Sequence, residues 1–121
     1  MFCLFVITAI AAKGDETIIK GEFGCAVCKD SLSFDGAPHC GGYIKQTANK
    51  YYYIKNGNDL VVSSGYPDNV FSASHYQMSK KVIATAILES IQKTNSINGI
   101  MVIDVKAKSV EIDGKTYSPR S

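Results

Sequence analysis

The chain has 121 residues, of which 45% are hydrophobic, so it can build one modest core and is too short for two ordinary domains. Thirteen basic and eleven acidic side chains leave a net charge of +2. This excess of positive charge is too small to indicate nucleic acid or any other charged molecule as a partner.

The first twelve residues are uncharged and apolar, and they end in small side chains. Such a segment is too short to span a bilayer, which needs about 20 residues, and is typical of the apolar region of a secretory signal. Ala9-Ile10-Ala11 would then be the cleavage site, although no basic residue precedes it. We therefore expect a signal peptide or its remnant at residues 1–12, a periplasmic or secreted domain at residues 13–121, and no transmembrane span after leader removal. A buried first strand or helix is the alternative.

Three segments in the first half combine β-branched and aromatic residues with polar ones, and turn residues bound them. This pattern predicts strands at residues 17–23, 43–47 and 50–55. The stretch 25–40 between the first two contains Asp, Ser, Gly and Pro, so we expect a loop there. Residues 57–79 show no sustained period, which predicts an irregular insertion with a short helix at 73–79.

The segment 81–89 fits two different periods. Apolar residues at 83, 87 and 91 would form a helical stripe, whereas the β-branched residues favour a strand. We favour the strand, because the segment 94–99 is hairpin-like and 100–107 is a strong strand pattern. The alternative is an α+β fold with a helix at about residues 79–92. Residues 109–117 are expected to extend the last strand through a bulge or to form a small terminal hairpin.

A strand at 81–89 has a definite consequence for its two faces. Successive side chains alternate, so Ile83, Thr85 and Ile87 share one face. The other face carries Val82, Ala84, Ala86 and Leu88. One of these faces must be largely buried, and Asn98-Gly99 is expected to make the following turn.

Five strands in this order, with an insertion between the third and the fourth, predict a mainly β fold, a small five-stranded OB-type barrel. The succession of strand, C-x2-C, loop, Cys, strand pair and the final KKVIATAILE…NGIMVIDVKAKSVEI hairpin resembles small exported OB-type bacterial proteins with cysteines near their first strand. The resemblance covers about residues 17–113. It implies an exported barrel, and most such proteins have no assigned activity.

The residues that could carry chemistry are Cys25 and Cys28, followed by the pair His39-Cys40. Thiolates two residues apart can face one metal ion, because a tight turn brings both sulfurs to the same side. We predict that the cysteine cluster is either structural or metal-binding, and that as a metal site Cys25, Cys28, His39 and Cys40 bind zinc or copper. Since His39 and Cys40 are adjacent and do not easily point at one ion, His75 is the other histidine that could complete the site.

Two alternatives for the cysteines stay open. A disulfide would join Cys40 to Cys25 or Cys28, and loss of Cys3 with the leader would leave one thiol over. A thiol redox function would need Cys25 as an exposed thiolate of low pKa, yet no helix is expected to begin at the motif.

Several tyrosines, with neighbouring lysines, could form a base-stacking face on an OB-type barrel. However, Tyr51 and Tyr53 should lie on one face of their strand and Tyr52 on the other, so at least one face is core or ordinary sheet surface. No catalytic motif occurs, and His75 is expected to be a loop histidine. We predict an exported, non-enzymatic module that binds a protein or a small ligand.

Overall fold

The computed structural model describes residues 16–29, 40–76, 81–97 and 99–120. The predicted leader, His39 and the last part of the predicted helix at 73–79 lie outside these ranges. The elements are, in chain order, β1 (Thr17–Gly24), α2 (Ala26–Lys29), β2 (Tyr43–Thr47), β3 (Lys50–Ile54), the 3-10 turn η1 (Gly57–Asp59), β4 (Leu60–Val61), α3 (Val70–Tyr76), β5 (Val82–Ile97), β6 (Ile100–Ile112) and β7 (Lys115–Pro119).

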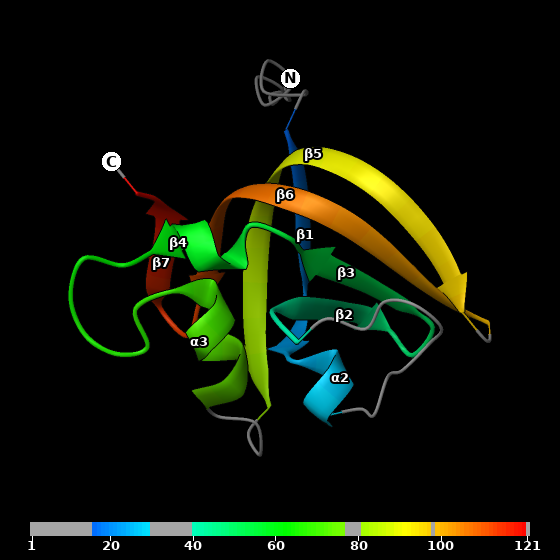
Figure 1. Ribbon diagram of the computed structural model, residues 1–121, viewed down its shortest axis with the longest axis horizontal. Helices are drawn as coiled ribbons and strands as arrows, with labels where there is room; N and C mark the ends of the chain where they lie inside the picture. Colours follow the sequence, from blue (N-terminus) through cyan, green and yellow to red (C-terminus); the bar gives the residue numbers. More distant parts are fainter. Residues whose placement is uncertain (1–15, 30–39, 77–80, 98, 121) are drawn as a thin grey trace, which may run out of the picture.

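Five of the strands close into a barrel (Figure 1). Around the barrel, β1 pairs with β2, β2 with β3, β3 with β6, β6 with β5, and β5 with β1. Only the β3–β6 pair in this ring is parallel. The small five-stranded OB-type barrel predicted from the sequence is therefore confirmed. Strand β6 continues beyond its pairing with β3 to pair with β7, which in turn pairs with β4.

The hydrogen bonding between β3 and β6, the pair that closes the barrel, continues beyond the end of β3. After β3 ends, the Lys55 amide donates to the Val105 carbonyl at 2.8 Å. The Asn56 side chain then forms two hydrogen bonds of 2.9 Å with the backbone of Ala107, accepting from its amide and donating to its carbonyl. Because a side-chain amide offers both a donor and an acceptor, Asn56 extends the pairing where the backbone has already turned away.

Residues 82–89, for which the sequence allowed a strand or a helix, belong to strand β5. It pairs with β1 through Thr17↔Leu88 to Phe23↔Val82 and with β6 on its other side. Ala84, Ala86 and Leu88 are buried in the barrel, whereas Ile83 is 46% exposed on the opposite face. The strand prediction and its faces are confirmed, and the helix at 79–92 with its α+β fold is wrong. Two flanking strands satisfy the backbone here, and small alanines fit the narrow interior.

The strand is also longer than expected. Residues 94–97, predicted as part of a hairpin turn, belong to β5 and pair with β6 as far as Ile97↔Ile100. A two-residue connection is enough for an antiparallel hairpin, and Gly99 adopts a φ of +82° that few other residues tolerate. Both outcomes predicted for the C-terminal segment occur: the β5–β6 register shifts in several places, and β6 and β7 form a terminal hairpin.

Apolar side chains from all five barrel strands meet inside the barrel. They are joined by Leu60 from β4, Val70 from α3 and Tyr117 from β7. Tyr52 points into this core. Tyr51 belongs instead to a second cluster, with Tyr43, Val102 and Ala26, while Tyr53 packs against it. The alternation expected along β3 is therefore confirmed.

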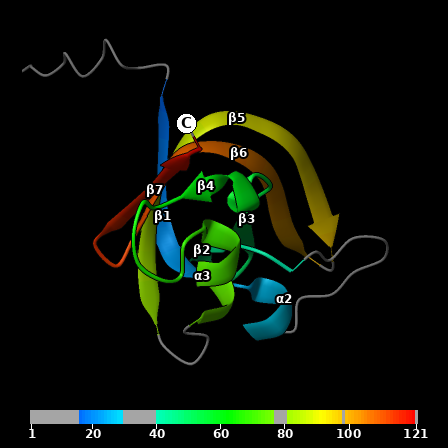
Figure 2. The same ribbon diagram turned by 60° about the vertical axis from the view of Figure 1, so that its left-hand side comes forward.

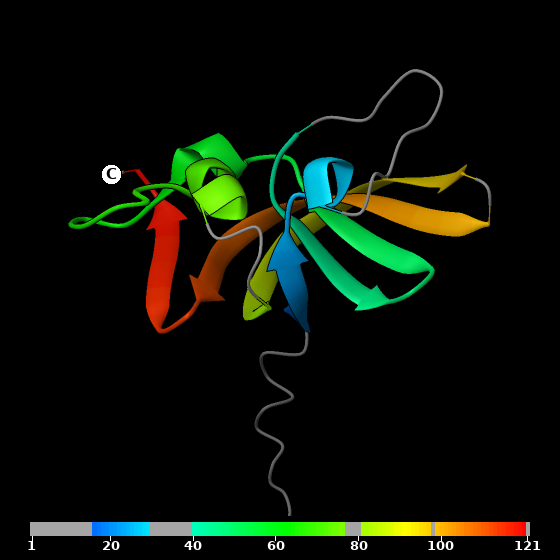
Figure 3. The ribbon, with the colours of Figure 1, turned by 90° about the horizontal axis from the view of Figure 1, so that it is seen from below.

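Two short helices differ from the sequence-based expectation. Helix α3 begins at Val70, three residues before the predicted start, because the Asn69 side chain accepts a hydrogen bond of 2.7 Å from the Ser72 amide. This N-cap was not recognised in the sequence. The loop predicted at 25–40 contains one helical turn, α2, immediately after Cys25. Figures 2 and 3 show α2 and α3 on the same side of the barrel.

Tyr117 anchors the irregular segment before α3 to the barrel. Its ring is buried, and its hydroxyl donates a hydrogen bond of 2.9 Å to the Pro67 carbonyl. Burial raises the pKa of the Tyr117 phenol, and the Asp68 carboxylate raises it further. The stability linked to this group is therefore complete below the unfolded-state pKa of about 10 and is lost as the pH rises through the higher folded-state pKa.

We predict that Tyr117→Phe lowers the free energy of unfolding by about 1 kcal/mol near neutral pH, because one buried hydrogen bond is lost. The variant should also lose less stability than the parent protein above pH about 10. Urea unfolding at both pH values measures the two effects. Tyr66→Phe, at a ring that is 65% exposed, serves as the control and should change neither quantity. Equal alkaline sensitivity of Tyr117→Phe and the parent would contradict the prediction.

Candidate metal centre

Cys25 and Cys28 are brought together by local structure. Cys25 directly follows β1 and is fully buried. Cys28 lies three residues further on, in the single turn of α2, and is exposed. Residues three apart on a helical turn share a face, so the C-x2-C spacing places both sulfurs on one side of the chain.

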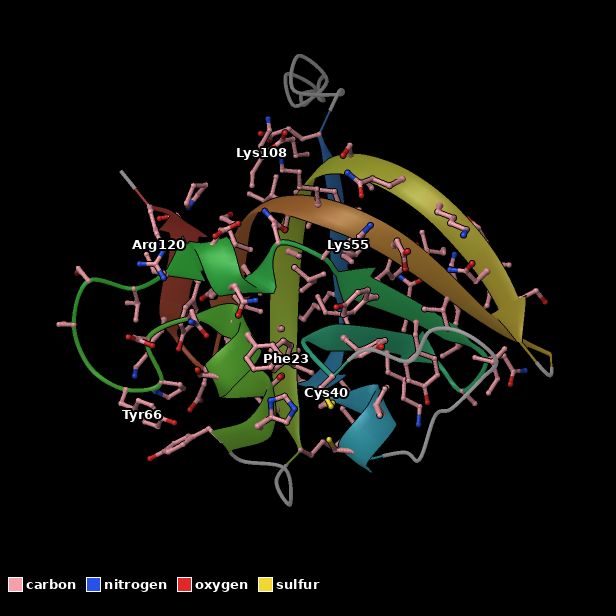
Figure 4. The ribbon with its side chains drawn as sticks, viewed as in Figure 1. Phe23, Cys40, Lys55, Tyr66, Lys108 and Arg120 are labelled. Carbon is pink, nitrogen blue, oxygen red and sulfur yellow. The ribbon has the colours of Figure 1, made fainter. Side chains whose placement is uncertain are left out.

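Cys40 reaches the same place through strand pairing. The antiparallel register of β1 and β2 joins Gly24 to Tyr43, so the chain that leaves β1 and the chain that enters β2 emerge at the same edge. Cys40 lies three residues before β2, and its sulfur is 3.7 Å from that of Cys28. Figure 4 shows Cys40 between α2 and α3.

Gly41 lets the chain approach β3 closely next to Cys40. A Cβ atom at Gly41 would lie 2.9 Å from Cε1 of the Tyr53 ring. Tyr53 has little freedom to move away, because its ring packs on Tyr43 with the centroids 4.8 Å apart. The absence of a side chain at residue 41 therefore lets the chain next to Cys40 pass close to the Tyr53 ring.

His75 completes the cluster from α3. Its Nδ1 atom lies 3.1 Å from the Phe71 carbonyl oxygen and 3.1 Å from the Ser74 hydroxyl oxygen. Its ring also packs on that of Phe71, with the centroids 5.0 Å apart. A Nδ1 atom that donates to a carbonyl leaves Nε2 with a lone pair, and metal-binding histidines are commonly oriented in this way.

The four side chains converge on a common point. One ligand atom from each of Cys25, Cys28, Cys40 and His75 lies within 4.8 Å of every other. A tetrahedral Zn²⁺ ion with Zn–S bonds of about 2.3 Å holds two sulfurs about 3.8 Å apart. The 3.7 Å between the Cys28 and Cys40 sulfurs matches that edge. This Cys3His cluster could hold a metal ion.

The crowding of sulfurs also affects protonation. The pKa of Cys28 is raised to about 12, first by its hydrogen bond with Cys25, then by desolvation and by Cys40. The physical cause is that a thiolate at Cys28 would form beside two other sulfur atoms. A bound cation would reverse this preference, because metal-coordinated thiols lose their protons.

The structure thus brings together Cys25, Cys28 and Cys40 of the predicted metal site. The fourth predicted ligand, His39, lies outside the described residues. His75 was named as the alternative histidine but was expected in a loop, whereas it lies in the last turn of α3. The Asn69 cap could have indicated the helix, but no local signal connects it to the cysteines.

The exposures of the three cysteines bear on the two alternatives. All three are free thiols in the structure. A redox function based on Cys25 was expected to need an exposed sulfur there, and Cys25 is instead fully buried. The exposed pair is Cys28 and Cys40.

The tyrosines of β2 and β3 do not form an open stacking surface. Tyr43 and Tyr51 are 2% and 4% exposed, and Ala26 and Val27 of α2 pack with them. Their rings meet edge to face, with the centroids 6.5 Å apart. Base stacking on these two rings would require α2 to move.

Comparisons of the chain with protein-family models, with curated proteins and with solved structures gave no match. In the part of the chain that the structure describes, no helix has the length and apolar character needed to cross a membrane.

We predict that Gly41→Ala lowers the free energy of unfolding by about 1–3 kcal/mol, because the new methyl group overpacks the Tyr53 ring. Gly57→Ala is the matched control. The nearest heavy atom to a Cβ there is 3.5 Å away, an ordinary contact, so the change should stay below about 1 kcal/mol. Chemical denaturation of both variants provides the comparison, and equal losses would show that Tyr53 does not constrain this position.

Proposed function

We propose that this domain binds one Zn²⁺ ion through Cys25, Cys28, Cys40 and His75. The observation that carries the proposal is the mutual approach of these four ligand atoms to within 4.8 Å. Three thiolates and one imidazole form a common structural zinc site, whereas Mg²⁺ and Ca²⁺ prefer oxygen ligands. Cu⁺ also accepts thiolates, but a set of three thiolates and one imidazole favours zinc.

The proposed ion has a structural role. It would connect the end of β1, the turn of α2, the entry to β2 and the last turn of α3. Helix α2 has four residues and α3 has seven, and helices this short have little stability of their own in water. A metal site formed only in the folded state adds its binding free energy to folding.

We further propose that the domain is a non-enzymatic binding module whose contact surface includes the edge of this metal centre. A surface depression of about 530 Å³ lies there, lined by Cys40, Tyr66, Phe71, Ser72, His75 and Tyr76. Tyr66 and Tyr76 are 65% and 52% exposed, and their rings meet edge to face. Exposed aromatic side chains beside a depression are suited to contact a protein or a small ligand.

The ligand assignment predicts the metal content of three variants. Protein purified under reducing conditions should hold about one equivalent of zinc, as a closed four-ligand site retains its ion. Cys25→Ser and His75→Ala should each weaken binding by more than about 100-fold, because even loss of a group that only orients a ligand costs about 10–100-fold. His39→Ala should retain the ion. Elemental analysis and competition with a chromogenic chelator provide the measurements.

The same set of variants can contradict the assignment. Loss of zinc in His39→Ala together with retention in His75→Ala would make His39 the fourth ligand. Stoichiometric copper in place of zinc would change the identity of the ion. Less than about a tenth of an equivalent of any metal in the parent protein would refute the metal-binding function.

The raised pKa of Cys28 predicts how binding depends on pH. In the metal-free protein the raised pKa keeps this thiol protonated near neutral pH, so a metal ion must displace its proton. Apparent affinity should therefore increase with pH, by about tenfold per pH unit for each proton displaced. Chelator competition at several pH values between about 6 and 8 measures the slope, and an affinity independent of pH would contradict this prediction.

A further inference from the structure

The three cysteine sulfurs differ in their access to solvent. Cys25 has no exposed surface, and it is followed by α2, whose first residue, Ala26, is also buried. Cys28 and Cys40 are both exposed. Reagents in solution therefore reach two of the three sulfurs and not the third.

The two accessible sulfurs are also close neighbours. They lie 3.7 Å apart, and a disulfide requires about 2.05 Å, so a small movement of either side chain is enough to form the bond. Cys40 lines the surface depression beside Phe71 and His75, which gives a small oxidant a route to its sulfur.

We propose that Cys28 and Cys40 are a redox modification site, at which a hydroperoxide converts the two thiols to a disulfide and the bound metal ion is released. This inference rests on the proposed metal-binding function and adds its regulation. Oxidation and metal binding compete for the same two sulfurs.

The reaction balances with the hydroperoxide as the only oxidant. The Cys40 thiolate attacks one oxygen of the peroxide, the O–O bond breaks, and the leaving oxygen takes up a proton to become an alcohol, or water when the oxidant is hydrogen peroxide. Cys40 is now a sulfenic acid. The Cys28 sulfur attacks the Cys40 sulfur, the S–O bond breaks, and the departing hydroxide takes up a proton to become water. Two thiolates lose two electrons and the peroxide gains them.

Disulfide formation removes half of the ligand set. Only Cys25 and His75 remain for the ion, and two protein ligands are too few for a closed zinc site. The new covalent bond keeps α2 joined to the entry of β2, as the metal did. It provides no connection to α3, so oxidation removes the link between His75 and the other two segments.

The experiment uses the full chain with Cys3→Ser, which removes a fourth thiol from the measurement. The protein is loaded with Zn²⁺ under reducing conditions, freed of reductant and treated with hydrogen peroxide. Released zinc is followed with a chromogenic indicator, and the cysteines are mapped by mass spectrometry after the thiols are blocked. We expect release of all bound zinc, a Cys28–Cys40 disulfide, an unmodified Cys25 thiol, and recovery of binding after reduction with dithiothreitol.

Two variants identify the reacting pair. Cys25→Ser should still form the Cys28–Cys40 disulfide, although it holds zinc weakly. Cys28→Ser should stop at a sulfenic acid on Cys40, which a dimedone adduct would reveal. A main disulfide that includes Cys25, or zinc retained until the thiols become sulfinic acids, would overturn the inference. Absence of zinc from the reduced protein, before any peroxide is added, would instead refute the proposed function itself.

Discussion

The parallel pairing of β3 with β6 is the interaction on which the rest of this structure depends. It connects strands that are far apart in the sequence, from Lys50↔Met101 to Ile54↔Val105, and Asn56 extends it to Ala107. With this pair in place no barrel strand lacks a neighbour on either side, so the curved sheet encloses one core. Within this sheet the antiparallel pairing of β1 with β2 places the end of β1 beside the start of β2, and the cysteines emerge at that edge.

The candidate metal centre is assembled from short segments that the barrel positions. The turn of α2 rests on Tyr43 and Tyr51, α3 is anchored by the buried Val70, and the residue after Cys40 packs against Tyr53. None of these segments is long enough to be stable alone, so their arrangement depends on packing against the sheet. The proximity of three sulfurs disfavours a thiolate at Cys28 and so raises its pKa. A cation bound among the sulfurs would stabilise the thiolate and lower that pKa.

The same packing covers part of the outer face of the barrel. In OB-type barrels the face of the second and third strands is a common place for oligonucleotides to bind. Here α2 covers part of that face, and two of its tyrosine rings are buried beneath the helical turn. Exposed aromatic rings lie instead at Tyr66 and at Tyr76, the last residue of α3, and both line the same depression as Cys40. These exposed rings thus lie next to the exposed Cys40 of the candidate metal centre.

The sequence by itself determined the strand at residues 82–88, since its alternation of β-branched and small residues is a local property that two flanking strands then satisfy. It did not predict the short strand β4 or the extension of β5 to Ile97. It also indicated that Cys25 and Cys28 share a side, because a tight turn at C-x2-C spacing brings both sulfurs together, whereas the helical turn α2 was not expected. Only the tertiary structure decided which histidine joins them. His39 is adjacent to Cys40 in the chain, yet His75 reaches the cluster because the Asn69 cap starts α3 and packing of Val70 directs the helix toward the cysteines. The burial of Cys25 and the exposure of Cys28 and Cys40 likewise depend on how α2 packs. The spacing of the cysteines in the sequence does not determine which of them is buried.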